Sequence, residues 1–305
     1  MRSFESVIVS FDIDWKWCGR MSNIIETKNL IYTYSKGMPD EKTAVNGISI
    51  GIEKGEFLGI IGHTGSGKST FIQNLNGLLK PTSGQVFIDG EDMWANKNKL
   101  REYRFKVGLV FQYPEYQLFE ETVFKDIAFG PRNMGLSEDE IKTRVARAAG
   151  YVGLTDEQLE RSPFDLSGGQ KRRAAIAGVL AMEPEVLILD EPNAGLDPAG
   201  LAEILEEIKR YHHERGNTVI IVSHSMDDVA RYAGRVMVIN EGELFCCDTA
   251  ARVFSMAAEL EAMGLAIPSV TGVLLRLNEM GHHLDAGAYT VEAAARSILK
   301  VVGSE

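Results

Sequence analysis

The sequence predicts an α/β protein built around a mostly parallel β-sheet, and two patterns carry this prediction. Uniformly apolar runs, Phe57–Ile61, Val186–Leu189 and Thr218–Val222, are typical of parallel strands that are covered on both faces. Apolar residues at helical spacing follow such runs, over residues 71–79 and 201–211. Strands that alternate with amphipathic helices favour a sheet with helices packed on it.

A glycine-rich loop joins the first of these strands to the helix that follows it. Residues 62–69 read Gly-His-Thr-Gly-Ser-Gly-Lys-Ser, the phosphate-loop pattern of a glycine, four residues and Gly-Lys-Ser, in its strand–loop–helix setting. Glycines can adopt conformations that turn several N–H groups toward one anion. Lys68 adds a positive charge, Ser69 a hydroxyl for Mg²⁺, and the helix points the positive end of its dipole at the phosphates. The loop therefore predicts a P-loop nucleoside triphosphatase rather than an ordinary glycine-rich turn.

An antiparallel layer precedes this loop. Ile48, Ile50 and Ile52 alternate with polar or small residues, as in a strand that has one face in solvent. Earlier in the chain, Tyr32 and Tyr34 lie on one face of another predicted strand. Their spacing leaves two interpretations equally open: ordinary packing on the core, or stacking of an aromatic ring on an adenine.

Polar side chains follow three of the predicted core strands. Gln112 follows residues 108–111, Asp190 and Glu191 follow the second apolar run, and His224 comes shortly after the third. In open α/β sheets ligands bind at the carboxyl ends of the strands. Two carboxylates at the end of a buried strand are costly unless they serve a cation or a proton transfer. Asp190 suits Mg²⁺ and Glu191 suits polarising an attacking water, whereas Gln112 and His224 are weak evidence when taken singly.

A second helix start also suits an anion. Ser167 stands where an N-cap belongs, and capping alone would explain it. Capping does not explain Gly168 and Gly169, because glycine weakens a helix by about 1 kcal/mol relative to alanine. Bare N–H groups at a helix start allow close approach to a phosphate. Asp197 and Pro198 open another helix, but there the cap and the first helical position account for both residues.

The pattern along the chain predicts its domains. We expect residues 1–20 to be a non-native or disordered extension before Met21, and residues 21–245 to form the nucleotide-binding domain. Within it, residues 114–165 are predicted to be a helical subdomain, with capping boxes at Ser137 and Thr155. Residues 246–305 are predicted to be a small helical appendage of three helices. The first of these carries Val253, Met256 and Leu260.

Bulk properties restrict the partners. The net charge is −11 at pH 7 and the isoelectric point is about 5.2, which argues against nucleic-acid binding as the main task. No apolar run approaches the roughly 18 to 20 residues that span a bilayer. Cys18, Cys246 and Cys247 form no metal-ligand or disulfide pattern, so we expect a reducing cytoplasm.

Taken together, these motifs resemble the ATP-binding subunits of ABC systems. The matching segments are Walker A at 62–69, the Q-loop at Gln112, the signature Leu166–Gln170, Walker B at 186–190 followed by Glu191, the D-loop Ala194–Asp197 and the switch His224. Residues 111–123 and 126–131 resemble more narrowly the ATPases of energy-coupling factor (ECF) vitamin and metal transporters, of the second, A-prime type. The tail, with Gly264–Pro268 and residues 290–292, is similar to that family's C-terminal helices.

The resemblance implies a site shared by two subunits that face head to tail. It implies that Lys68, Gln112, Glu191 and His224 are catalytic, that Ser69, Gln112 and Asp190 hold Mg²⁺, and that Tyr34 stacks on adenine. The residues implied to bind ATP are Tyr34, Gly62, His63, Thr64, Gly65, Ser66, Gly67, Lys68, Ser69 and Thr70, with Ser167, Gly168, Gly169 and Gln170 acting on the partner's nucleotide. Asp197 is implied to cross the subunit interface.

The same resemblance implies the partners. They are a second ABC ATPase, more often a different chain than a copy of this one, a transmembrane coupling subunit that docks after Gln112, and a substrate-binding membrane subunit. No nucleic acid is implied, and the expected place is the cytoplasmic face of the membrane. One departure from the family is Asn193, where threonine is common; asparagine still donates and accepts hydrogen bonds.

Two other functions compete with an ATP-driven importer of a vitamin, metal ion or similar micronutrient. A soluble ABC ATPase of DNA repair or translation usually has a long coiled-coil insertion or two nucleotide domains, and this sequence has neither. A lone P-loop kinase has no use for the signature segment. The sequence therefore favours the transporter subunit.

Overall fold

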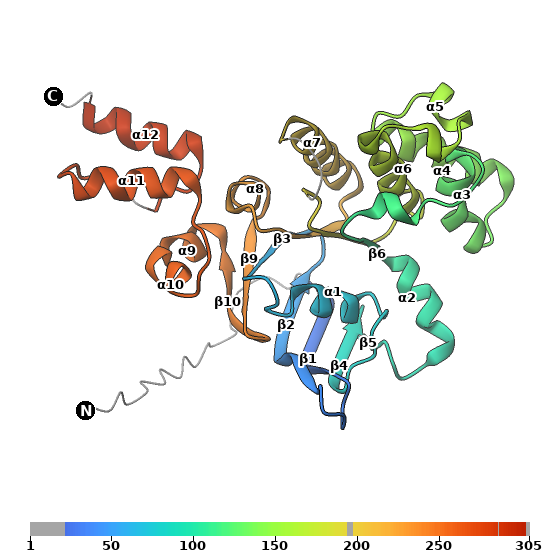
Figure 1. Ribbon diagram of the computed structural model, residues 1–305, viewed down its shortest axis with the longest axis horizontal. Helices are drawn as coiled ribbons and strands as arrows, with labels where there is room; N and C mark the ends of the chain where they lie inside the picture. The colour runs from blue at the N-terminus through green and yellow to red at the C-terminus, as the bar shows by residue number, and fades with distance from the viewer. Residues whose placement is uncertain (1–21, 194–197, 286, 303–305) are drawn as a thin grey trace.

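The computed structural model describes residues 22–193, 198–285 and 287–302, which form two β-sheets and their surrounding helices (Figure 1). The extension expected at residues 1–20 and the D-loop segment at 194–197 lie outside the described residues. The described helices include none that is long and apolar enough to cross a membrane.

The first sheet is the antiparallel layer that the alternating pattern predicts. Its strand order is β2-β1-β4-β5, with β1 at Asn23–Tyr34, β2 at Lys42–Glu53, β4 at Ser83–Ile88 and β5 at Glu91–Asp92. On β2, Ile48, Ile50 and Ile52 are buried, as the period of two requires. This layer presents one apolar face to the rest of the molecule.

The second sheet is the mostly parallel core. Its strand order is β10-β9-β3-β8-β7-β6, from β10 (Glu243–Thr249) and β9 (Arg235–Asn240) through β3 (Phe57–Ile61), β8 (Thr218–Val222) and β7 (Val186–Asp190) to β6 (Val107–Val110). Every pair is parallel except β10 with β9. β3, β7 and β8 are buried along their whole length, which explains their uniform apolar sequences.

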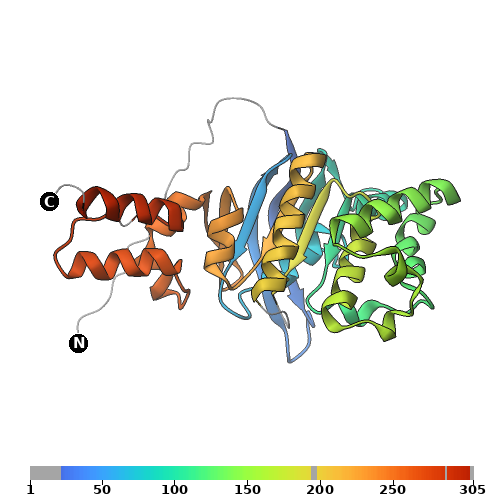
Figure 2. The ribbon, with the colours of Figure 1, turned by 90° about the horizontal axis from the view of Figure 1, so that it is seen from above.

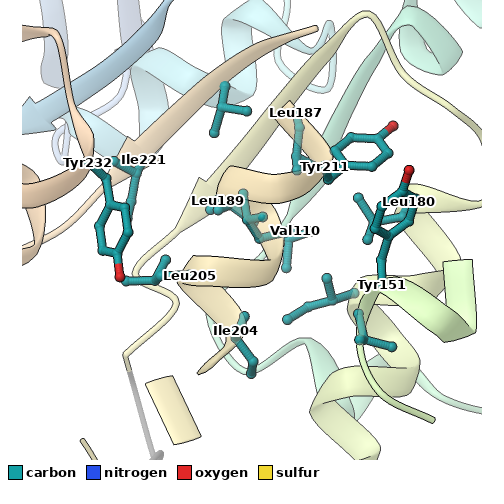
Figure 3. Packing of buried hydrophobic residues seen from close by; sticks show 14 of the residues in the cluster. Val110, Tyr151, Leu180, Leu187, Leu189, Ile204, Leu205, Tyr211, Ile221 and Tyr232 are labelled. Atoms are coloured by element: carbon teal, nitrogen blue, oxygen red, sulfur yellow. The ribbon is translucent and has the colours of Figure 1, made fainter. Parts of the chain in front are cut away.

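Helices cover the parallel sheet on both faces. On one face, α1 (Lys68–Leu75) packs between the two sheets, with Phe71, Ile72 and Leu75 in their shared core. On the opposite face lie α7 (Pro198–Arg215) and α8 (Met226–Tyr232), as Figures 1 and 2 show. Figure 3 shows Ile204 and Leu205 of α7 among the apolar side chains of the sheet, such as Leu189.

A group of helices flanks the edge strand β6 in the sequence, with one helix before this strand and the others after it. α2 spans Leu100–Lys106, η2 Pro114–Gln117, α3 Val123–Asn133, α4 Glu138–Tyr151, α5 Asp156–Glu160, η3 Pro163–Asp165 and α6 Gly168–Leu180. The capping boxes predicted at Ser137 and Thr155 both form. Tyr151 joins this group to α7, because its hydroxyl donates to Glu214 at 2.7 Å and its ring meets Tyr211 edge to face (Figure 3).

The C-terminal segment has four helices rather than the three expected. They are α9 (Ala250–Ser255), α10 (Ala257–Ala262), α11 (Ser269–Glu279) and α12 (Val291–Val302). The first expected helix is divided at Met256, whose ψ of 47° leaves helical geometry. Val253 and Leu260 on its two halves are both fully buried in the main core, so the bend keeps both anchors in place. The domain boundary expected at residue 245 stays a prediction; strand β10 runs across it to Thr249.

Cys246 and Cys247 are neighbours in β10 but lie in different environments. Cys246 packs against the core that contains α7 and α8, and Cys247 against the core between the two sheets, as successive residues of a strand do. Burial raises the pKa of the Cys246 thiol to about 12 and that of Cys247 to about 11. Their geometry therefore offers neither a metal-binding pair nor a reactive thiolate.

This environment predicts slow thiol chemistry. In a Cys18→Ser variant at pH 8, we expect the folded protein to react with a maleimide about 100-fold more slowly than free cysteine, because so little thiolate is present. In denaturant, both thiols should react at the rate of free cysteine. Labelling of the folded variant at the free-cysteine rate, followed by mass spectrometry, would contradict the burial of these two side chains.

Candidate functional site

The phosphate loop is tightly packed against two neighbouring strands. At Gly67 the backbone has a φ of 100°, and an added Cβ would lie 2.0 Å from the carbonyl oxygen of Ala44 on β2. At Gly62 an added Cβ would lie 2.3 Å from the carbonyl oxygen of Ile239 on β9. Both distances are shorter than any side chain tolerates, so only glycine fits at these positions. The Gly242 N–H also donates to the Ser66 carbonyl at 2.9 Å, which fixes the loop from its far side.

Lys68 lies in the centre of this loop. Its ammonium donates to the carbonyl oxygens of Gly62 at 2.6 Å and His63 at 2.9 Å, and the side chain is buried. Burial lowers the pKa of Lys68, while the nearby carboxylates of Glu191 and Asp190 act in the opposite direction. The loop therefore holds one fixed positive charge where the helix N-terminus already favours an anion.

Ser69 and Asp190 form a second part of the site. The Ser69 hydroxyl donates to Asp190 Oδ1 at 3.3 Å, which joins the start of α1 to the end of β7. Asp190 is buried, and this burial raises the pKa of its carboxyl. A hydroxyl and a carboxylate at this separation, with the amide oxygen of Gln112 at the same sheet edge, form an oxygen donor set of the kind that Mg²⁺ prefers. These residues fit a magnesium ion.

Glu191, which follows β7, contacts residues that follow two neighbouring strands. Its Oε1 lies 2.6 Å from Nε2 of His224, which follows β8, and its Oε2 accepts from the side-chain amide of Gln112, which follows β6, at 2.9 Å. Its backbone has a φ of 48°, uncommon for a residue with a side chain, and its N–H donates to the Val222 carbonyl at 2.9 Å. The chain leaves β7 in a sharp turn that aims this carboxylate along the sheet edge.

A pocket of about 510 Å³ opens over these groups. It is lined by Tyr34, Lys42, Ala44, Thr64, Gly65, Gly67, Lys68, Ser69, Thr70, Gln112, Glu191 and His224. The sequence left core packing and adenine stacking open for Tyr32 and Tyr34, and the structure puts the two side chains in different places. Tyr34 lines the pocket, and its hydroxyl lies 3.0 Å from that of Thr70, whereas Tyr32 packs on the core between the sheets.

Comparison with known proteins places this site in a family. The family model described as ABC transporter matches residues 45–194. An energy-coupling factor transporter ATP-binding protein, EcfA2, of Clostridium acetobutylicum is 56% identical over 281 residues, which cover 92% of this chain and 98% of that protein. The chain belongs to the ATP-binding proteins of ECF transporters. The soluble ABC ATPase of DNA repair or translation is not favoured by these relatives.

Solved structures place the fold of this ECF ATP-binding protein as well. The Clostridium perfringens protein cbiO1, part of the ABC transporter complex cbiONQ, is 40% identical with a TM-score of 0.70, over 85% of this chain and 98% of that one. A dimeric ATP-binding cassette in a post-hydrolysis state, bound to ADP and Pi, is 29% identical with a TM-score of 0.67, over 74% of this chain and 98% of that one. The predicted α/β fold with a P-loop is therefore confirmed.

The signature segment of this ECF ATP-binding protein lies apart from its own pocket. Ser167 caps α6 in a capping box with Gln170; Ser167 and Gly168 are exposed, and Gly169 is half-buried. None of these four residues lines the pocket. The predicted site residues thus form two groups: the pocket with the loop that frames it, and the exposed start of α6.

Two pocket residues were missed by the sequence interpretation. Lys42 and Ala44 line the pocket from β2, where Lys42 is paired in register with Tyr34 of β1. The period of two on β2 was visible in the sequence, but the pairing of β1 with β2 that brings Lys42 to the pocket was not. His63, Gly62 and Ser66, by contrast, frame the loop without lining the pocket.

Proposed function

We propose that this chain binds ATP with Mg²⁺ in the 510 Å³ pocket and hydrolyses it together with a second ATPase subunit, to drive uptake through an ECF transporter. The observation that carries this proposal is the convergence of Gln112, Glu191 and His224 beside the loop that holds Lys68. Family membership supports ATP hydrolysis coupled to transport.

The pocket suggests how each end of the nucleotide is held. Tyr34 provides a half-exposed aromatic face at one end, suited to stacking on adenine. The N–H groups of the loop and the Lys68 ammonium bind the phosphates at the other end. Because Lys68 already donates to two loop carbonyls, its ammonium group is held in position before the phosphates bind.

Ser69, Asp190 and Gln112 would hold Mg²⁺ through their oxygen atoms. When bound, the ion would neutralise charge on the terminal phosphates. Its positive charge would also lower the pKa of Asp190, which burial raises.

Glu191 acts on the water that attacks the terminal phosphate. Its carboxylate accepts the developing proton of that water, and His224 holds the carboxylate from one side. Both carboxylate oxygens already have partners, because Gln112 occupies the other one. We infer that Gln112 moves away from Glu191 when the water enters, which would leave its side chain free to hold a magnesium ion.

The exposed start of α6 is proposed to complete the pocket of the partner subunit. Ser167 caps this helix, and a Cβ added at Gly168 or Gly169 would meet no other described part of the chain within 4 Å. A similar cassette is a dimer that holds ADP and Pi. We favour a heterodimer over a homodimer, as in the ECF family that the sequence resembles.

A second cavity is the proposed contact with the transmembrane coupling subunit. It has a volume of about 430 Å³ and lies between α3, α6 and the segment that follows Gln112. Phe119 and Phe129 border it edge to face, and both are largely exposed for aromatic residues. In this proposal the chain lies on the cytoplasmic face of the membrane, and a separate membrane subunit selects the vitamin, metal ion or similar micronutrient.

Replacing Lys68 by alanine tests the nucleotide site. We expect the dissociation constant for ATP to rise on the order of 100-fold, because a buried, charge-assisted phosphate contact is lost. The measurement is titration of the full chain with a fluorescent ATP analogue. Lys36→Ala, an exposed lysine in the β1–β2 turn that does not line the pocket, is the matched control and should bind as the wild type does. Equal affinity of the Lys68→Ala protein would remove the basis of the proposal.

A further inference from the structure

Asp227 joins the helix that follows His224 to the C-terminal helices. On α8, its Oδ1 accepts the backbone N–H of Ser269 at 2.8 Å and its Oδ2 accepts the Ser269 hydroxyl at 2.6 Å. Ser269 is the first residue of α11. Figures 1 and 2 show α8 at the end of the core nearest to α11 and α12. One carboxylate thus connects two segments that are 42 residues apart.

This contact satisfies a need of α11. The N-cap residue of α11 is Pro268, which has no side-chain acceptor, and no cap hydrogen bond comes from its own side chain. The first N–H groups of a helix need an acceptor, and a negative charge there is favourable to the helix dipole. Asp227 supplies both from a neighbouring helix. The side chain that caps the N-terminus of α11 therefore comes from α8.

At this same end, the N-terminus, α8 is joined closely to His224. Ser225 directly follows the histidine, caps α8 through the Asp228 N–H, and donates its own N–H to the Ser223 hydroxyl at 3.0 Å. Met226 and Val229 bury α8 in the core. His224 stands on a short segment that cannot move independently of the start of α8.

The C-terminal helices form a small unit of their own. α11 and α12 share a separate apolar cluster of Leu274, Ala288 and Ala294, and the buried Thr271 hydroxyl donates to the Ala288 carbonyl at 3.0 Å. A displacement of this pair of helices would reach α8 through the Asp227–Ser269 contact.

We propose that the α11–α12 pair sets the position of His224 through Asp227, which makes Asp227 a positioning residue for ATP hydrolysis. This inference rests on the proposed role of His224, which holds the Glu191 carboxylate during ATP hydrolysis. It gives the C-terminal helices a task in the hydrolytic site, although they contribute no residue to the pocket.

The test compares Asp227→Ala with Asp228→Ala in the complex purified with its partner subunits. Asp228 carries the same charge in the same helix turn, and the two hydrogen bonds to Ser269 come from Asp227, so Asp228 controls for charge and for the helix dipole. We expect Asp227→Ala to slow ATP turnover about tenfold at unchanged ATP affinity, as loss of a charge-assisted hydrogen bond allows. Ser269→Ala should show a smaller loss of about threefold, and Asp228→Ala none.

The same substitution in a His224→Ala protein separates an effect on the position of His224 from general destabilisation of the fold. In a His224→Ala protein, adding Asp227→Ala should cause no further loss of turnover, because Asp227 acts through the missing histidine. Amide hydrogen exchange of residues 223–225 should also be faster in Asp227→Ala than in Asp228→Ala. A full additional loss in the His224→Ala background, or unchanged exchange with unchanged turnover, would overturn the inference.

The exchange measurement also keeps the two proposals apart. A wild-type complex without ATP turnover would contradict the proposed function. Faster exchange at residues 223–225 in the Asp227→Ala protein would still support the link between the C-terminal helices and the His224 segment, and unchanged exchange would reject that link.

Discussion

Replacing Glu191 by glutamine is expected to leave ATP bound to this chain while slowing its hydrolysis at least about 100-fold. Glutamine has nearly the same shape and can keep a hydrogen bond to His224, whose Nε2 lies 2.6 Å from the carboxylate. It cannot accept a proton from the attacking water. The substitution therefore separates the binding of ATP from its conversion.

An azido-ATP that is labelled on its γ-phosphate measures the binding and the hydrolysis of ATP on each subunit separately. After incubation of the complex, light attaches the nucleotide to the chain that holds it, and the subunits are separated. We expect the label to persist on the Glu191→Gln chain and to disappear from the wild-type chain. Glu102→Gln, an exposed residue of α2, is the control and should behave as the wild type does. Loss of label from Glu191→Gln at the wild-type rate would show that another group activates the water.

Replacing Gly169 by aspartate is expected to have the second large effect. Beyond its chain neighbours and its own helix backbone, no described atom lies within 4 Å of a Cβ at this position, and an aspartate in the first turn of α6 is favourable to the helix dipole. The chain should therefore fold and bind ATP normally. In the dimer, the new carboxylate would stand against the phosphates held by the partner, so hydrolysis at the partner's pocket should fall at least about 100-fold.

Gly150→Asp is the matched control for this variant. Gly150 is a helical glycine that likewise has open space at its Cβ, but it belongs to α4 and not to the start of α6. Turnover of the Gly150→Asp complex should stay near that of the wild type. Equal losses in both variants would indicate a general effect of added negative charge rather than a contact with nucleotide.

The predictable parts of the fold depend on short stretches of sequence. The capping boxes at Ser137 and Thr155 each span only four consecutive residues, and both form. The buried parallel strands can be recognised by their uniformly apolar sequences. The phosphate loop is likewise recognised from a short stretch, and the close approach of other strands requires glycine at Gly62 and Gly67.

The parts that could not be predicted depend on contacts between distant segments. Nothing near Lys42 indicates that pairing with β1 brings it to the pocket. The bend at Met256 depends on the core that receives Val253 and Leu260, and local helical spacing continues through it. Asp227 reads as an ordinary acidic residue in a first helical turn, and only the fold reveals that it caps another helix.

The central claim is that the pocket of this chain is completed by a different subunit, while its own signature segment serves the partner. The most direct measurement is subunit-resolved photolabelling of the complex that carries Gly169→Asp in this chain, with azido-ATP labelled on its γ-phosphate. The claim predicts that hydrolysis stops at the partner's pocket, so that label persists on the partner, while binding at this chain's pocket is retained. Loss of nucleotide from this chain's own pocket, with the partner unaffected, would contradict it.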